Sequence, residues 1–395
     1  MKKTFVKFCV LQGAYWSFQA AVPGYITAYM LSKGMPASTL GILLSANLLC
    51  AFLGALYWGR WVDRKQASRR FFLMANAAAL GLGLLSFLFA GNSAALFIIY
   101  PLFGFMNGPI ATALDAWVIA SFPDRSGAGP RARSFATLSY AIVMLVMGQL
   151  VTRVGYHVMP FAAVLFLGVS VAVALTQPEA RRVTEAAERP VQSGPKQLLS
   201  VRRYVLLVAA MFFTGMAVAP INNMKVLVFE SVGGDVSFLG WDSFIGCMIQ
   251  APFLLFAGRL RRIRTERRLI LGAVAALLYA GIVAAARFPA MVIAGTVMNN
   301  VSFGVLYPAM REMTEASVDP SLRNTAHSII DVAYGSLSGM IATAWSGSVM
   351  QYAGSAVMGS VCVGIELVSI ALCVLLVLRS SVRRCAPHKK RIAVG

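Results

Sequence analysis

The sequence predicts an all-α membrane protein in which twelve transmembrane helices form two pseudo-symmetric six-helix bundles. Three observations lead to this expectation. Of the 395 residues, 58% are hydrophobic and only 13% are charged, too few polar residues to cover a soluble protein of this length. The apolar residues gather in runs about as long as a bilayer-spanning helix. Landmarks of the first half also recur, in order, in the second half.

Twelve apolar runs are expected to cross the bilayer. The first is preceded by two lysines and lacks a small-residue cleavage site, so we expect a membrane helix and not a removable signal peptide. In chain order, the expected spans are Phe5–Met30, Thr39–Tyr57, Phe71–Ala90, Ala94–Phe122, Arg133–Val154, Val158–Thr176, Tyr204–Glu230, Phe238–Gly258, Leu269–Ala286, Ala290–Thr314, Leu322–Gln351 and Ser355–Leu378.

A polar stretch divides the chain into two halves. Residues 177–200 are rich in Arg, Glu, Pro and Gln and contain no apolar run, which is typical of a solvated linker. The expected units are an N-terminal bundle at 1–176, a linker at 177–201, a C-terminal bundle at 202–379 and a basic tail at 380–395. The repeated landmarks are Pro23 and Pro220, Arg69-Arg70 and Arg267-Arg268, Met106-Asn107 and Met298-Asn299, and Arg133 and Arg323.

The positive charge indicates which way the chain crosses the membrane. The net charge is +20, but the lysines and arginines lie in turns between apolar runs, which indicates topology and argues against nucleic-acid binding. With the N-terminus inside, only Lys33, Arg153 and Arg287 fall in outer loops, and Lys225 falls within a span. The sequence therefore predicts that both termini are cytoplasmic, in the inner membrane.

One basic stretch carries a family resemblance. Gly59 is followed four residues later by Asp63-Arg64, and then by the pair Arg69-Arg70. This stretch resembles the signature loop of the major facilitator superfamily, although Gln66 or Ala67 stands where a later glycine is usual. The resemblance implies that Gly59, Asp63 and Arg64 form a conformational gate, pairing with a neighbouring helix in one conformation only. The alternative is a solvated turn that only sets topology.

Three ionisable residues in the spans are candidates for proton coupling, because such groups cost about 3 kcal/mol at a helix centre. Asp115 continues a stripe of small residues, and it either faces a central cavity or pairs with Arg131 or Arg133. His327 and Asp331 are i, i+4 neighbours that can relay a proton, or they pair with each other at headgroup level. Asp115 and the arginine that opens the next span are most similar to the superfamily's sugar and nucleoside proton symporters.

Prolines at corresponding places in the two halves point to a substrate site. Interrupted helices in matching positions are typical of transporter binding sites at the interface of the two halves. Lys225 either attracts a negatively charged group of the substrate or extends to the outer interface. Gln12 shares a helix stripe with two of the candidates. The substrate-binding candidates are Trp16, Gln19, Asn107, Asn222, Asn223, Lys225, Gln250, Asn299, Asn300 and Tyr307.

The expected function is secondary active transport of a small polar metabolite, a sugar, a nucleoside or a small organic acid, by alternating access with proton symport. Alternatives are a proton-coupled efflux antiporter, although the glycine- and proline-rich motif of drug antiporters is absent around Gly148, and a non-transporting membrane sensor. The sequence contains no P-loop, H-E-x-x-H or G-x-S-x-G motif and its six cysteines lack metal-site spacing. We therefore expect no enzyme activity, cofactor or metal, and a monomer in the bilayer.

Overall fold

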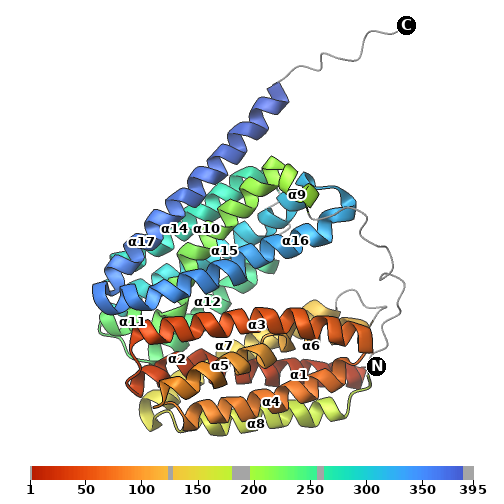
Figure 1. Ribbon diagram of the computed structural model, residues 1–395, viewed down its shortest axis with the longest axis vertical. Helices are drawn as coiled ribbons and strands as arrows, with labels where there is room; N and C mark the ends of the chain where they lie inside the picture. Colours follow the sequence, from red (N-terminus) through yellow and green to blue (C-terminus); the bar gives the residue numbers. More distant parts are fainter. Residues whose placement is uncertain (1, 123–127, 180–195, 256–261, 386–395) are drawn as a thin grey trace.

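The computed structural model describes residues 2–122, 128–179, 196–255 and 262–385. Within these ranges the chain forms helices and no strands, as the sequence predicts. Two bundles lie one above the other in Figure 1, the N-terminal half in red to yellow and the C-terminal half in green to blue. The predicted linker falls mainly on residues 180–195, outside the described residues, and the domain boundaries stay a prediction.

In its described residues, the N-terminal bundle contains eight helices. They are α1 (Lys2–Ala21), α2 (Pro23–Ser32), α3 (Ala37–Lys65), α4 (Ser68–Leu88), α5 (Ser93–Asn107), α6 (Ile110–Ser121), α7 (Ala128–Val154) and α8 (Val158–Leu175).

The C-terminal bundle follows the same plan. Its described elements are α9 (Lys196–Ser200), α10 (Arg202–Asn223), α11 (Lys225–Ser231), α12 (Ser237–Leu255), α14 (Thr265–Ala284), α15 (Pro289–Ser317), η1 (Pro320–Leu322), α16 (Arg323–Asp331), η2 (Val332–Leu337) and α17 (Ser338–Cys385).

Several predicted spans are interrupted helices. The first span consists of α1 and α2, which meet at Val22, directly before Pro23. A proline has no amide hydrogen, so the carbonyl of Gln19 loses its helical partner there. The seventh span consists of α10 and α11, which meet at Met224, four residues after Pro220. The interruptions predicted at corresponding places in the two halves are therefore present.

The last two predicted spans join in one long element. Helix α17 reverses at Gly354, whose φ of 83° lies in the left-handed region that favours glycine. By length and apolar composition, nine helical stretches of the described chain can cross a bilayer, and one of them, Arg323–Leu378, contains this reversal. The count of twelve spans stays a prediction.

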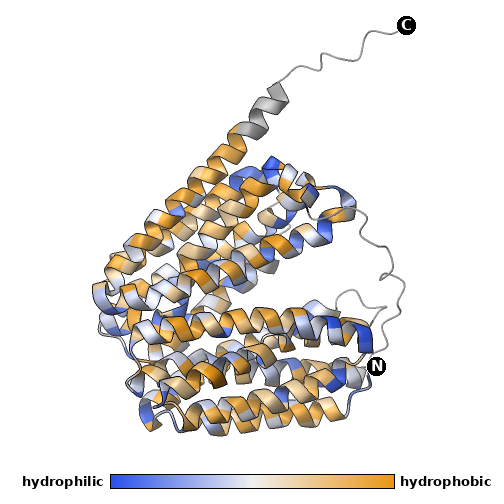
Figure 2. Ribbon diagram, in the orientation of Figure 1, coloured by the Kyte–Doolittle hydropathy of each residue, from blue (hydrophilic) through white to orange (hydrophobic). Residues whose placement is uncertain are grey.

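The outer surface of both bundles is apolar, as contact with lipid tails requires. Leu88 and Phe161 are among the large apolar side chains on it and are 78% and 77% exposed. Figure 2 shows hydrophobic residues along the lengths of the helices and hydrophilic residues gathered near their ends. This distribution matches a band of lipid around the helix centres.

The two bundles touch at one end, which we call the closed end. There the Ser38 amide donates a hydrogen bond to Gln351 Oε1 (2.9 Å). Nearby, the Ser45 hydroxyl donates to the Met340 carbonyl (2.8 Å). These bonds join α3 to α17, and α7 packs against α12 beside them. Toward the other end, where the N-terminus lies, the bundles diverge in Figure 1.

The structure corrects one local expectation. The stretch from Gly59 to Arg70 was expected to be a turn, but α3 continues through Lys65. The chain turns only at Gln66 and Ala67, and Gln66 adopts the left-handed conformation (φ 49°) common after a helix. Continued helix satisfies the backbone hydrogen bonds, and basic residues are favourable at a helix C-terminus.

Candidate functional site

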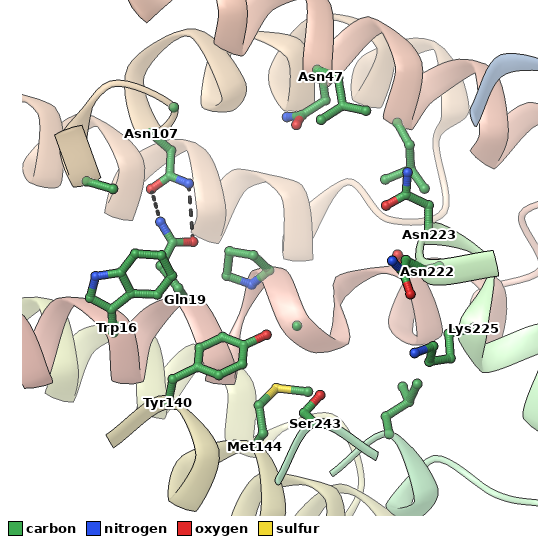
Figure 3. A pocket seen from close by; sticks show the side chains of 18 of the residues that line it. Trp16, Gln19, Asn47, Asn107, Tyr140, Met144, Asn222, Asn223, Lys225 and Ser243 are labelled. Atoms are coloured by element: carbon green, nitrogen blue, oxygen red, sulfur yellow. Dashed lines mark hydrogen bonds between the residues drawn. The ribbon is translucent and has the colours of Figure 1, made fainter. Parts of the chain in front are cut away.

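A cavity of about 650 Å³ lies between the two bundles, near the closed end. Helices α1, α2, α3, α5, α6, α7, α10, α11 and α12 contribute to its wall. The lining mixes aromatic rings with uncharged amides, and it holds one lysine and one aspartate. Figure 3 shows these side chains pointing into a common space from both halves. The labelled residues are Trp16, Gln19, Asn47, Asn107, Tyr140, Met144, Asn222, Asn223, Lys225 and Ser243.

Gln19 and Asn107 form an amide pair on the N-terminal wall. Gln19 Nε2 donates to Asn107 Oδ1 (3.0 Å), and Asn107 Nδ2 donates to Gln19 Oε1 (3.3 Å). Figure 3 draws both bonds. Gln19 Nε2 also donates to the Tyr15 hydroxyl. The pair joins α1 to the end of α5 and presents donors and acceptors to the cavity.

Lys225 and Asp242 form an ion pair on the C-terminal wall. Lys225 Nζ lies 2.8 Å from Asp242 Oδ2, and it also donates to Thr296 Oγ1 (3.0 Å). The two charged side chains are only 11% and 4% exposed. Lys225 therefore does not extend to the outer interface, and Asp242 balances its charge in this conformation.

Two lining side chains keep polar atoms without a hydrogen-bond partner in the described part of the chain. They are Trp16 Nε1, a donor, and Asp242 Oδ1, an acceptor. Burying such atoms without partners is unfavourable.

Asp115 of α6 is not among the described residues that line the cavity. Its partners come from α1 and α7. It accepts hydrogen bonds from Gln12 Nε2 and Arg133 Nη1, each 2.7 Å long. The Arg133 guanidinium also lies 4.3 Å from the Trp16 ring, in a cation–π contact. This ion pair is about two-fifths exposed, so in this conformation the alternative of an arginine partner for Asp115 is realised.

Comparisons with known proteins agree with this architecture. A family model described as the MFS_1 like family matches residues 9–359. The chain belongs to the MFS_1 like family. It is therefore a multi-pass membrane protein and a transporter of the major facilitator type, similar to sugar and nucleoside symporters, as the resemblance in the loop after the second span implies.

Individual relatives of this MFS_1 like protein are distant in sequence. The maltose permease of Geobacillus stearothermophilus is 22% identical over 321 residues, which is 79% of each chain. The crystal structure of the nucleoside transporter NupG matches with a TM-score of 0.77 and 14% identity, over 95% of this chain and 98% of that one. The D-xylose-proton symporter matches with a TM-score of 0.66 and 14% identity, over 93% and 96%. At these identities the structures establish the fold alone.

Asp331 of the MFS_1 like chain does not bond to His327. Arg311 Nη2 donates to Asp331 Oδ2 (2.5 Å) and to the Tyr307 hydroxyl (2.7 Å). His327 Nε2 instead lies 3.4 Å from Glu315 Oε1. In this conformation, each of the two predicted relay residues therefore pairs with a different residue.

The remaining substrate candidates divide between the cavity and the helix interfaces. Asn222 accepts from the Tyr279 hydroxyl (2.8 Å), and Asn223 donates to Thr343 Oγ1 (2.5 Å); both line the cavity. Asn300 donates to the Thr296 carbonyl one turn earlier. Among the described residues, the cavity lining does not include Gln250, Asn299, Asn300 or Tyr307.

The proposed gate lies on the last turns of α3. Gly59 is half-buried there and Arg64 is exposed. The side chain of Asp63 lies outside the described residues. Close by, the Arg69 guanidinium donates to the Leu175 carbonyl (3.0 Å) and ties the start of α4 to the end of α8.

Sequence reasoning missed Asp242 and Arg311. Both lie inside predicted spans, so the rule that found Asp115, an ionisable group in an apolar run, would have found them too. It also missed the aromatic side of the cavity, which includes Tyr15, Tyr100 and Tyr140. No pattern in the sequence separates these tyrosines from those that only pack.

Proposed function

We propose that this protein is a proton-coupled symporter that moves a neutral polar solute, of the sugar or nucleoside class, across the cytoplasmic membrane by alternating access. The observation that carries the proposal is the cavity of about 650 Å³ lined by both halves. In alternating access, one half rocks against the other around such a site. We also propose that both termini are cytoplasmic, because the basic residues gather in the loops on that side. In this orientation, the closed end faces the outside of the cell.

The cavity chemistry favours an uncharged solute with hydroxyl groups or a base. The amides of Gln19, Asn107 and Asn222 can both donate and accept hydrogen bonds. The ring of Trp16 offers an apolar face against which a sugar or base can stack. Because Asp242 balances the charge of Lys225, the wall does not offer the excess positive charge that an organic acid would need.

Proton coupling is proposed through acids that bond to arginines in this conformation. Asp115 bonds to Arg133 and Asp331 bonds to Arg311, and His327 adjoins the second pair. Protonation would neutralise either carboxylate and weaken its ion pair. A proton that stabilises one conformation more than the other shifts their populations, which is what symport requires.

Counterflow in proteoliposomes tests the transport step. Vesicles holding the purified full chain are loaded with unlabelled maltose, xylose or uridine and then diluted into the labelled solute. We expect transient uptake of at least one neutral solute and none of benzoate, the anionic control. A protein that only senses its ligand would show no counterflow, and uptake of benzoate alone would contradict the neutral class.

A cavity variant connects transport to the site. Asn107→Ala removes an amide that lines the cavity, and loss of one hydrogen bond to the solute, worth about 1.4 kcal/mol, should raise the half-saturation concentration roughly tenfold. The matched control is Asn324→Ala, which removes an exposed amide from α16. An unchanged half-saturation concentration in Asn107→Ala would remove this wall from the binding site.

A further inference from the structure

Glu366 is a carboxylic acid buried in the middle of the last transmembrane stretch. Its side chain is fully buried. It lies twelve residues after the reversal at Gly354, so at about 1.5 Å per residue it is about 18 Å from the closed end, near the middle of a bilayer of about 30 Å. It does not line the central cavity and has no part in the mechanism above.

The partners of Glu366 are hydroxyl groups. Thr214 Oγ1 of α10 lies 3.1 Å from Glu366 Oε1 and 2.7 Å from the Ser369 hydroxyl. Ser369 in turn donates to the Ala210 carbonyl (2.9 Å). Glu366 Oε2 has no hydrogen-bond partner within the described chain.

No cation of the described residues compensates a charge on Glu366. Within the described chain its carboxyl group has one hydrogen bond, to the uncharged Thr214, and the ion pairs described in the C-terminal half all involve other acids. An isolated ionised carboxylate in such surroundings costs far more than a neutral acid with one unpaired oxygen. Glu366 therefore carries a proton in this conformation.

Titratable neighbours connect this acid to the open part of the C-terminal half. On α17 itself, Cys362 lies one turn before Glu366 and Cys373 lies two turns after it. Tyr334 of η2 and Tyr307 pack in one cluster with Cys373 and with Ile370, one turn after Glu366. From α10, the uncharged Thr214 bonds to Glu366.

These neighbours join a partly exposed cluster to the buried acid. Tyr307 belongs to the cluster of Arg311 and Asp331, whose side chains are about a third exposed. Tyr307 and Tyr334 are both half-buried, and Glu366 is fully buried. Because Tyr334 packs with Tyr307 and with α17, it is the candidate relay between the exposed cluster and Glu366.

The segment that carries Tyr334 departs from α-helical winding. Residues 332–337 form a π-helix, a form that is rare and frequent at functional sites. Gly215 of α10 packs directly on this segment, where an added Cβ would clash with the Tyr334 carbonyl oxygen. A change of η2 to α-helical winding would rotate Tyr334 against Glu366 and Thr214.

We propose that Glu366 is a proton-binding site of the C-terminal half, separate from the central cavity, that is loaded in the present conformation and releases its proton in the opposite one through Tyr334. One proton binds to the carboxylate and the same proton leaves it, so the group is restored in each cycle. The inference rests on the proposed proton-coupled transport and adds a buried site to it.

The test follows pH-driven movement without any solute. Spin labels are placed at Lys33 and Tyr352, exposed residues of the two halves at the closed end, in a full chain in which Cys50, Cys247 and Cys385 are alanine. The distance between the labels is measured from mildly acidic to mildly alkaline pH. We expect the parent protein to shift between two distances, Glu366→Gln to stay at the acidic distance, and Glu366→Asp to regain the shift.

Transport assays separate this inference from the proposed function. Glu366→Gln should keep the counterflow of the parent protein but lose accumulation driven by a pH gradient. The ratio of solute concentration inside the vesicles to that outside should fall to one. Should Glu366→Gln fail to fold, Tyr334→Phe should lose the pH-driven shift in its place. The proposed proton site would be wrong if the label distance in the parent protein did not change with pH. It would also be wrong if the label distance in Glu366→Gln changed with pH as it does in the parent protein. Absent counterflow in the parent would contradict transport itself.

Discussion

At the scale of single residues, the ion pairs of this protein differ in burial. Lys225 and Asp242 are almost completely buried, whereas Asp115 and Arg133 are about two-fifths exposed. A buried charge depends on its partner, because removal of the partner leaves the charge uncompensated in a medium of low dielectric constant. A half-exposed charge keeps part of its hydration. The two pairs should therefore respond differently to substitution.

Lys225→Met should destabilise the protein by about 3–5 kcal/mol, because Asp242 remains buried and unpaired. The double variant Lys225→Met with Asp242→Leu should recover most of this loss. Thermal unfolding of the purified protein measures both, with Lys33→Met as the control for loss of an exposed lysine. If the double variant melts as low as Lys225→Met, the pair does not account for the loss.

Asp115→Asn should change the stability by about 1 kcal/mol or less, because the pair with Arg133 is partly solvated. If Asp115 couples transport to protons, the same variant should lose accumulation driven by a pH gradient and keep counterflow. Asp319→Asn is the matched control, since Asp319 is exposed outside the cavity. If Asp115→Asn still accumulates the solute fully in a pH gradient, Asp115 does not couple transport to protons.

Three of the residues that line the N-terminal wall were predicted from the sequence. Trp16, Gln19 and Asn107 stood out because polar side chains are rare within apolar runs. Their partners were not predictable, because sequence spacing places residues on one helix face and does not say which face of another helix meets it. The bond between Gln12 and Asp115 joins residues 103 positions apart.

At the scale of elements, the closed end depends on close contact between helices from the two halves. A Cβ added to Gly41 would lie 2.8 Å from the Thr343 carbonyl oxygen and 3.1 Å from Gly347 Cα. Small residues allow helix backbones in membranes to approach in this way. This seam between α3 and α17 must separate before the cavity can open on that side.

Gly41→Ala should weaken the closed end, because the added methyl group clashes with the backbone of α17. A cysteine placed at Thr27, which lines the cavity, reports on access from outside through its reaction with an impermeant maleimide in whole cells. The reaction should accelerate roughly tenfold if the equilibrium shifts by about 1.4 kcal/mol.

Gly81→Ala is the control for this variant, because nothing lies within 4 Å of a Cβ added there. A rate that is unchanged in Gly41→Ala would show that the seam does not control access. A rate that rises equally in both variants would indicate general loosening of the bundle.

The interrupted helices show how local sequence becomes a functional feature at this scale. Pro23 and Pro220 were recognisable because proline removes a backbone donor wherever it occurs in a helix. The π-helix at 332–337 was not, since its residues, Val332 to Leu337, include no proline and carry no sequence signal for an extra residue per turn. In the structure, this π-helix packs against Gly215 of α10.

At the scale of the whole molecule, the proposed orientation in the membrane rests on charge. Lys33 ends α2, five residues before the bond of Ser38 to Gln351 at the closed end, whereas Arg64 and Lys65 lie in the last turn of α3, at its opposite end. Cytoplasmic loops of membrane proteins carry the excess of these residues. In the proposed orientation the protein is therefore open to the cytoplasm in this conformation.

Reporter fusions check this orientation. Green fluorescent protein fused after residue 395 should fluoresce, because it folds in the cytoplasm, and alkaline phosphatase fused there should be inactive. Phosphatase inserted after Gly34 should be active, because that loop is expected outside. The reverse pattern of activities would invert the topology and make the closed end the cytoplasmic one.

The sequence by itself determined the fold class, the two-fold repeat, the interrupted helices and much of the polar lining. These features depend on composition and on spacing along one helix, which short stretches of sequence specify without any knowledge of neighbouring helices. The apolar runs are long because no water is available to the backbone within a bilayer, and this constraint acts on each run separately.

Only the tertiary structure decided which charges neutralise one another and which conformation the protein adopts. The sequence left open that Lys225 attracts an anion, and the structure places Asp242 beside it. The bond between Glu366 and the hydroxyl of Thr214 likewise depends on the packing of α10 against α17. Coulomb interactions and burial depend on distances between helices. These distances are set by the packing of two bundles against each other, which no single stretch of the chain contains.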